Sequence, residues 1–224
     1  MMASAEPVEG TSEAAAAAAR ASKGLFVVFE GIDGSGKSTV SRLVFEELSA
    51  ALPGRVVLTA EPTDSFIGDA VRHANSSDVD LLAEGLLFVA DRAEHTRQIR
   101  AWLEAGKVVL CDRYAASTIA YQGALLSERL GGTRIAVDWL KLVNEPAIIA
   151  PDLTLLLTVK VSLALKRLRS RRELTKFEED GYLGEVDLIY RSLAMEDRSF
   201  VTLDASRPAA EVAKEALRYI RSKI

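Results

Sequence analysis

The sequence predicts an α/β fold, in which a parallel sheet carries helices on both faces. Five short apolar runs alternate with longer amphipathic stretches, and a glycine-rich GxxxxGKS loop follows the first run directly and leads into a helical pattern. Each apolar run is long enough to predict a fully buried strand. The runs occupy residues 25–30, 55–60, 108–112, 153–159 and 200–204.

The segments around these runs complete one predicted domain. Residues 1–23 are an alanine-rich, low-complexity leader, which we expect to be a frayed helix or a disordered tail. A chain of 224 residues is long enough for one core and too short for two ordinary enzyme domains, so residues 24–224 should form a single domain. Helical patterns cover residues 38–48, residues 78–103, the segment after Arg113, and residues 207–224.

Composition excludes several function classes. The formal charge of −4 gives no basic field for nucleic acid or an anionic membrane, and no run of about 18 apolar residues could span a bilayer. The only cysteine, Cys111, builds neither a disulfide framework nor a zinc site, which suits a reducing compartment. Because the first residues lack the pattern of a secretory signal, we expect a cytoplasmic protein whose partners are small-molecule anions.

The loop after the first run carries the strongest functional signal. Gly31 follows the run, Gly36 stands five positions later, and Lys37 opens the next helical pattern. Backbone N–H groups of residues 33–38 can converge on a phosphate at the helix N-terminus. Lys37 can bridge the β- and γ-phosphates of ATP, and the Ser38 hydroxyl can bind Mg²⁺. The predicted ATP-binding residues are Gly31, Ile32, Asp33, Gly34, Ser35, Gly36, Lys37, Ser38 and Thr39.

A second polar cluster follows the third apolar run. Asp112 and Arg113 stand at the sheet edge where ligands of such folds bind. Asp112 can assist the metal ion, and Arg113 offers a planar fork for a phosphate of the second substrate. Elsewhere such a pair would more often be a structural ion pair, but its place beside the glycine-rich loop favours a functional role.

Six motifs, in this order, resemble those of the thymidylate kinase family: FEGIDGSGKST, EPT, LLFVADRAEH, DRYAASTIAYQGA, PDLTLLLTV and LKRLRSRREL. The resemblance covers about nine-tenths of the chain, from near Phe26 to the C-terminus. It implies a P-loop kinase fold with a five-stranded parallel sheet, a homodimer formed through helices, and Mg·ATP as the donor that phosphorylates dTMP to dTDP. A deoxynucleoside kinase or another nucleoside-monophosphate kinase is the alternative, whereas a GTPase would need an NKxD guanine reader, which the sequence lacks.

The resemblance also implies roles in the acceptor site. Asp33 would turn away from the donor phosphates and accept a hydrogen bond from the 3′-hydroxyl, unless it is only a turn-forming residue. Phe88 and Arg92, four residues apart on one helix face, would stack on thymine and donate to its O4, unless Phe88 belongs to the core. Tyr121 would lie under the 2′ carbon, unless it is a buried structural tyrosine.

The remaining acceptor contacts implied by the resemblance come from Glu61, Arg113, Ser117, Thr118 and Gln122. Which residue of 61–64 contacts the acceptor phosphate is left open, because the Pro and Thr after Glu61 depart from many relatives.

Residues 167–178 resemble the mobile, arginine-rich lid of this family. Guanidinium groups stabilise the charge of a phosphoryl group in transfer. Because Gly34 and Ser35 stand where some relatives carry a basic loop residue, the lid should supply the catalytic arginine, and Arg171 aligns best with that role. Arg172 is expected to be an ordinary solvated residue. The predicted catalytic residues are therefore Lys37, Asp112 and Arg171, and the predicted metal ligands are Ser38 and Asp112.

Overall fold

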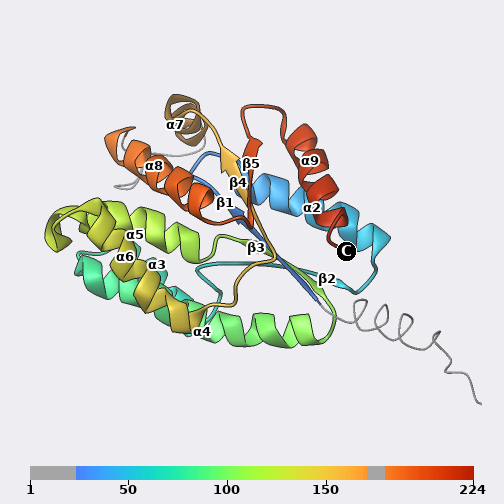
Figure 1. The fold of residues 1–224 in the computed structure, drawn as a ribbon, viewed down its shortest axis with the longest axis horizontal. Helices are drawn as coiled ribbons and strands as arrows, with labels where there is room; N and C mark the ends of the chain where they lie inside the picture. Colours follow the sequence, from blue (N-terminus) through green and yellow to red (C-terminus); the bar gives the residue numbers. More distant parts are fainter. Residues whose placement is uncertain (1–23, 171–179) are drawn as a thin grey trace, which may run out of the picture.

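A five-stranded sheet forms the centre of the molecule (Figure 1). The structure is a computed structural model, and it describes residues 24–170 and 180–224. Every pair of neighbouring strands is parallel, in the order β2-β3-β1-β4-β5. The predicted α/β class with five parallel strands is thereby confirmed. The strands are β1 (Leu25–Glu30), β2 (Val56–Ala60), β3 (Val108–Asp112), β4 (Leu153–Thr158) and β5 (Phe200–Asp204).

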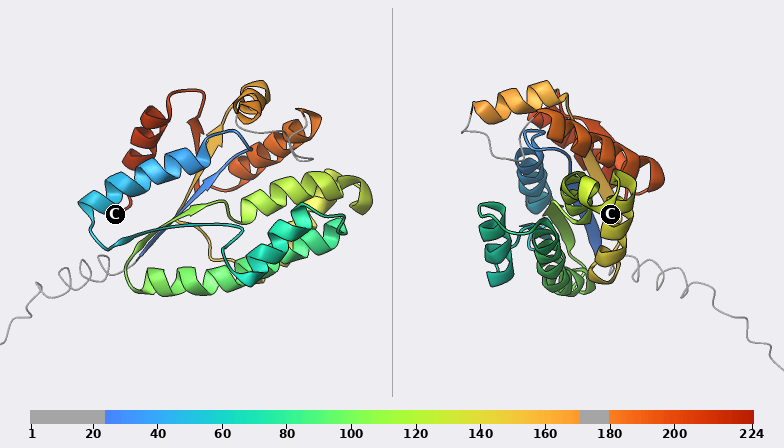
Figure 2. Two further views of the ribbon diagram at one scale, coloured as in Figure 1. Left: turned by 180° about the vertical axis from the view of Figure 1, so that it is seen from behind. Right: turned by 90° about the vertical axis from the view of Figure 1, so that its left-hand side faces the viewer.

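Helices cover both faces of the sheet (Figure 2). On one face, α2 packs against α9; on the other lie α4, α5 and α8, with α3 against α4 and α6 against α5. Within the described ranges, no helix is long and apolar enough to cross a membrane. The helices are α2 (Lys37–Ala51), α3 (Phe66–Asn75), α4 (Leu81–Glu104), α5 (Ala115–Leu130), α6 (Thr133–Asn144), η1 (Glu145–Ala147), α7 (Val161–Arg169), α8 (Asp180–Glu196) and α9 (Ala209–Arg221).

The expectation of five fully buried strands is wrong for two of them. All six side chains of β1 are buried, whereas Val56 to Thr59 of β2 are half-buried and, in β5, only Leu203 is buried. The reason is position, because β2 and β5 are the two edge strands and each has a neighbour on one side only. Hydrophobicity alone could not distinguish an edge strand from a central strand.

Local signals placed the helix starts only approximately. The long helix predicted over 78–103 begins at Leu81, because the Asp80 side chain caps it by accepting hydrogen bonds from the Leu82 and Ala83 N–H groups. The helix predicted over 38–48 extends from Lys37 to Ala51, and the last helix is shorter than 207–224.

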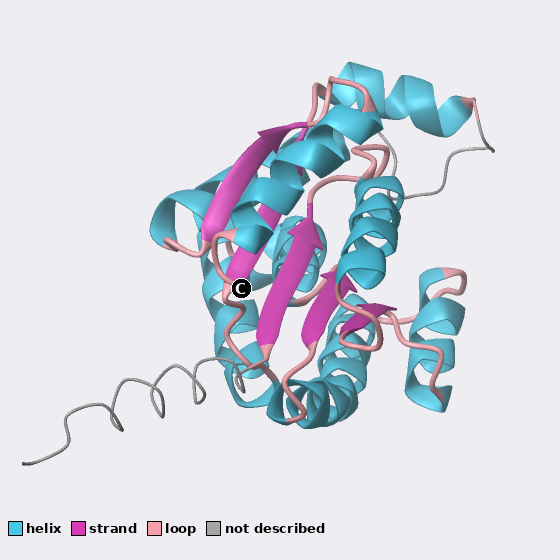
Figure 3. Cartoon of the chain, turned by 90° about the vertical axis from the view of Figure 1, so that its right-hand side faces the viewer, coloured by secondary structure: helices cyan, strands magenta, loops and turns pink. Residues whose placement is uncertain are grey.

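The functional side chains follow the carboxyl ends of the strands. Because all neighbouring strands are parallel, the loops after β1, β2 and β3 leave the sheet at one edge (Figure 3). Register brings these ends together, because Asp112 of β3 pairs with Phe29 of β1 and with Ala60 of β2. The glycine-rich loop, Glu61 and Arg113 therefore follow adjacent strands.

Candidate active site

The glycine-rich loop between β1 and α2 has a backbone that glycine permits. Gly31, Gly34 and Gly36 have φ values of 137°, 79° and 99°, a region that residues with a side chain rarely adopt. Space is also limiting at Gly34, where an added Cβ would lie 2.4 Å from the carbonyl oxygen of Ala164 in α7. Gly36 is the N-cap residue of α2, and no side chain caps this helix. The helix N-terminus is therefore available to an anion.

Lys37 folds back over this loop. Its side chain is only 4% exposed, and its Nζ donates to the carbonyl oxygen of Ile32 over 3.0 Å. Burial, followed by the positive charge of Arg113, lowers the pKa of Lys37 to about 8. Asp33 and Asp112 act in the opposite direction. The ammonium is thus held inside the loop, close to where a bound phosphate would compensate for its lost hydration.

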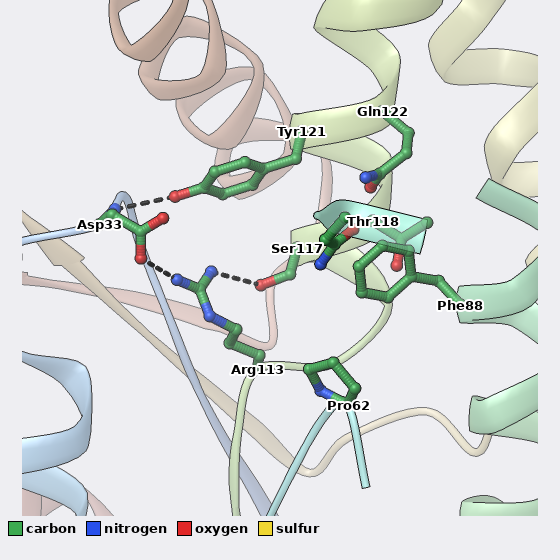
Figure 4. A pocket seen from close by; sticks show the side chains of 9 residues that line it. Asp33, Pro62, Phe88, Arg113, Ser117, Thr118, Tyr121 and Gln122 are labelled. Carbon is green, nitrogen blue, oxygen red and sulfur yellow. Dashed lines mark hydrogen bonds and ion pairs between the residues drawn. The ribbon is translucent and has the colours of Figure 1, made fainter. Parts of the chain in front are cut away.

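A cleft beside the loop collects side chains from several elements (Figure 4). The Asp33 N–H donates to the Tyr121 hydroxyl over 2.8 Å, and the Asp33 carboxylate forms an ion pair with Arg113. Arg113 also donates to the Ser117 hydroxyl over 3.3 Å, and its guanidinium lies over the Tyr121 ring. The cleft is lined by Asp33, Pro62, Asn75, Phe88, Arg113, Ser117, Thr118, Tyr121 and Gln122.

Seven predicted acceptor residues are therefore brought together in one cleft. Burial raises the pKa of the Tyr121 hydroxyl, so that side chain stays neutral and can serve as a packing surface. The structure does not bring Glu61 and Arg92 to the lining of this cleft.

Arg92 lies in a buried polar network behind the cleft. Its side chain is only 1% exposed, and it donates to Asn144 over 2.5 Å, to Glu61 over 2.6 Å and to Thr118 over 2.9 Å. Glu61 in turn contacts the His95 ring over 2.9 Å. Of the pair expected to face the cleft, Phe88 lines it, whereas Arg92 is buried and donates to Thr118, a lining residue. A role of Arg92 in base recognition stays a prediction.

Ser38 and Asp112 fit the pattern of a magnesium site. Both line a second cavity next to the loop, and the Oδ1 atom of Asp112 is buried without a hydrogen-bond partner in the described structure. Mg²⁺ commonly takes one or two protein oxygens and fills its remaining positions with water and substrate phosphates. The described part of the chain contains no cluster of three or more His, Cys, Asp or Glu side chains that could hold a metal by itself.

Comparison with known proteins decides the family. A family model described as thymidylate kinase matches residues 29–216. The chain belongs to the thymidylate kinase family. It is 43% identical to a probable thymidylate kinase of Methanococcoides burtonii, over 90% of this chain and 98% of that protein. It is 41% identical to a probable thymidylate kinase of Methanosarcina barkeri, over 88% of this chain and 96% of that one.

A solved structure shares the fold. The crystal structure of thymidylate kinase from Ehrlichia chaffeensis matches with a TM-score of 0.71 and 28% identity, covering 88% of this chain and 99% of that one. The resemblance predicted from the six motifs is thereby confirmed.

The predicted lid of this thymidylate kinase family member is described only in part. Arg167, from α7, donates to the carbonyl oxygens of Gly34 and Ser35 over 3.3 and 3.4 Å and to that of Ala205 over 3.0 Å. It therefore supports the glycine-rich loop. Arg169 is exposed at the end of α7, whereas Arg171 and Arg172 lie outside the described residues.

Sequence reasoning missed four residues of the site and its support. Pro62 and Asn75 line the cleft, and His95 and Asn144 belong to the network around Arg92. Pro62 lies in the EPT motif and His95 in LLFVADRAEH, so the family motifs could have pointed to both residues. Asn75 and Asn144 lie in none of the six motifs. They reach the site from the ends of α3 and α6.

Proposed function

We propose that this chain transfers the γ-phosphoryl group of ATP to dTMP, giving dTDP. The observation that carries the proposal is the place of Asp33, which belongs to the glycine-rich loop and also lines the cleft. A phosphate donor bound at the loop and an acceptor bound in the cleft would therefore lie next to each other, because Asp33 belongs to both sites. Positioning of this kind, together with cations around the phosphates, is the main source of catalysis in phosphoryl transfer.

On the donor side, the loop N–H groups and Lys37 would hold the ATP phosphates. Ser38 and Asp112 would hold Mg²⁺, which neutralises phosphate charge when it is bound. Arg171 is proposed to stabilise the transferred group. Replacing Arg171 by Ala should lower kcat by roughly a hundredfold or more while dTMP affinity changes much less. A loss of dTMP affinity alone would assign Arg171 to the acceptor site instead.

On the acceptor side, Arg113 would bind the dTMP phosphate and Asp33 the 3′-hydroxyl, with the Tyr121 ring under the 2′ carbon. A ribonucleotide would then press its 2′-hydroxyl against that ring and leave it unpaired, so dTMP should be preferred by on the order of a hundredfold in kcat/KM. Asp33→Ala should largely erase the difference between dTMP and its 3′-deoxy analogue. Equal penalties for both acceptors in Asp33→Ala would remove the sugar assignment.

At the base, Phe88 would supply a stacking face, and Thr118 and Gln122 would supply hydrogen-bonding groups. Donation from Arg92 to O4 of thymine stays a prediction, because the guanidinium would have to exchange one of its present partners. Glu61 is proposed to act through Arg92, since it binds that side chain and not the cleft.

Two further features belong to this proposal. The protein would be a homodimer that acts on small-molecule nucleotides rather than on nucleic acid. Its location would be cytoplasmic, which suits a chain with one buried, unpaired cysteine among the residues described.

A nucleotide panel tests the function. ATP consumption should be measured with dTMP, dUMP, dCMP, dGMP and thymidine as acceptors. The expected order is dTMP first, with dUMP penalised by about 1–3 kcal/mol in kcat/KM for the missing methyl group. Faster reaction with thymidine than with dTMP would indicate a deoxynucleoside kinase, and consumption without acceptor dependence would overturn the proposal.

A further inference from the structure

The first turn of α5 lacks a cap of its own. Its N-cap residue, Tyr114, makes no side-chain capping bond. Arg113, immediately before it, has a φ of 72°, which is unfavourable for a residue with a side chain. The N–H groups at the start of a helix have no partner within the helix, so they must be satisfied from elsewhere when they are buried. The Ser117 N–H also reaches the carbonyl oxygen of Tyr114 over 3.1 Å, whereas the Tyr114 N–H needs a partner outside this turn.

That partner is the carboxylate of Glu30. Its Oε1 accepts hydrogen bonds from the N–H groups of Tyr114 and Ser117, over 2.9 and 3.1 Å. Its Oε2 accepts from the hydroxyls of Ser117 and Tyr190, over 2.6 and 2.9 Å. Glu30 is 0% exposed, so these protein groups take the place of bulk solvent around its carboxylate.

The topology explains how a strand can cap a helix. Glu30 is the last residue of β1, and β1 pairs with β3, whose end leads through Arg113 into α5. In the register between β1 and β3, Phe29 lies opposite Asp112, so Glu30 comes level with the turn that contains Arg113. Among the described residues, the four donors to Glu30 come from α5, its N-cap residue and α8, and none comes from the glycine-rich loop.

Hydrogen bonds and the charge of Arg113 offset part of the cost of burying the Glu30 carboxylate. Burial raises the pKa of the Glu30 carboxyl, while the hydrogen bond from Ser117 and the positive charge of Arg113 lower it. A buried carboxylate generally costs stability unless its oxygens are fully hydrogen-bonded, which is the case here. An apolar residue would fill the same space, but it could not accept the N–H groups of Tyr114 and Ser117.

We propose that Glu30 is a positioning residue of the acceptor site, which sets the first turn of α5 and thereby the places of Arg113 and Ser117. The inference rests on the proposed function, since it assigns acceptor binding to the cleft that these two residues line. Glu30 would act through Arg113 and Ser117 rather than by touching a substrate.

Two substitutions separate reach from charge. Glu30→Gln keeps the length of the side chain, so its amide oxygen can still accept both N–H groups, while Glu30→Asp keeps the charge and loses the reach. For Glu30→Asp we expect dTMP to bind about tenfold more weakly, because one charge-assisted hydrogen bond to the helix start is lost. This should raise both the KM for dTMP and the dTMP dissociation constant, which calorimetry measures without ATP. The KM for ATP should change by less than about twofold, and Glu30→Gln should lie nearer to wild type for both substrates.

Asp152 provides the matched control. Its carboxylate accepts a hydrogen bond from the N–H of Phe26 over 2.8 Å. Phe26 lies near the start of β1, whereas Glu30 is its last residue. Asp152→Ala should lower the free energy of unfolding and leave both KM values unchanged. Equal weakening of dTMP and ATP in Glu30→Asp, or a larger dTMP effect in Glu30→Gln than in Glu30→Asp, would overturn the proposal.

Should Glu30→Asp not fold, Tyr190→Phe takes its place, because it removes one donor from the same carboxylate. It should weaken dTMP binding about two- to fivefold with the KM for ATP unchanged. Unchanged dTMP affinity in a folded Tyr190→Phe variant would then overturn the positioning role. Failure of the proposed function is distinguishable, because the wild-type protein would then not phosphorylate dTMP.

Discussion

Lys37 and Arg92 are both almost fully buried, yet their partners differ in kind. Among the described residues, Lys37 has a carbonyl oxygen as its hydrogen-bond partner and no carboxylate within ion-pair distance. Arg92 has a carboxylate, an amide oxygen and a hydroxyl. A buried cation without a counter-ion costs stability, whereas a paired one becomes costly only when its partner is removed. The two residues should therefore respond oppositely to substitution.

Lys37→Met is expected to abolish phosphoryl transfer and to leave the free energy of unfolding equal to or above that of wild type. The lowered pKa of Lys37 shows that folding disfavours its charged form, so the loss of that charge should stabilise the fold by on the order of 1 kcal/mol. Single-turnover rates and urea denaturation measure the two effects. Lys160→Met, at an exposed lysine, is the control and should change neither. Near-normal turnover in folded Lys37→Met would contradict the donor assignment.

Arg92→Ala is expected to lower the free energy of unfolding by about 3–5 kcal/mol, because it leaves the buried Glu61 carboxylate without its ion-pair partner. Chemical denaturation measures this loss. Arg97→Ala removes an ion pair with Glu94 from the exposed side of the same helix and should leave the midpoint unchanged. If Arg92→Ala proves as stable as Arg97→Ala and loses only dTMP affinity, Arg92 is a base-reading residue rather than a support for Thr118.

At the scale of elements, the donor loop depends on a close contact with α7. Gly34 meets the Ala164 carbonyl there, and Arg167 donates to the carbonyl oxygens of Gly34 and Ser35. The conformation of the loop therefore depends on contacts with α7 as well as on the backbone angles that its glycines permit.

Gly34→Ala should raise the KM for ATP at least about tenfold, because an added methyl group would push the loop away from α7. Gly54 is the matched control, since its φ of 72° is also left-handed but an added Cβ would meet nothing within 4 Å. Gly54→Ala should cost roughly 1 kcal/mol of stability from backbone strain and leave the KM for ATP unchanged. Equal ATP effects in both variants would show that backbone strain alone is responsible.

At the scale of the whole molecule, large apolar side chains stay exposed on the helices. They include Phe66 on α3, Leu86 on α4, Leu142 on α6 and Leu188 on α8. Exposed apolar side chains on helices favour contact with another chain when they are grouped.

From the homodimer proposed above, we predict that the protein sediments with the mass of two chains. Sedimentation velocity over a range of protein concentrations measures this directly. A single-chain mass at every concentration, with full dTMP kinase activity, would contradict the predicted homodimer. The assay should be repeated with dTMP present, so that a ligand-dependent dimer is also detected.

The sequence by itself determined the features that rest on local chemistry. The strand, the glycines and Lys37 of the donor loop are adjacent in the chain, so their spacing predicted both the loop and its place between a strand and a helix. The alternation of apolar and amphipathic segments predicted a parallel sheet, because this pattern too can be read from neighbouring residues. Asp112 and Arg113 could be located because the end of a parallel strand is also the ligand edge.

Only the tertiary structure decided which polar side chains face the cleft and which support it. Phe88 and Arg92 are four residues apart on one helix, but Phe88 lines the cleft. Arg92 is buried, where it donates to Asn144 and Glu61. Glu30 reads as the last residue of a buried strand, yet it caps a helix that begins 85 positions later, at Ala115. The periodicity of hydrophobic residues indicates which side of a helix or strand is buried. The partner of a buried charged side chain, in contrast, is a residue distant in sequence. Such partners come together only when the sheet has formed and its strand ends are aligned.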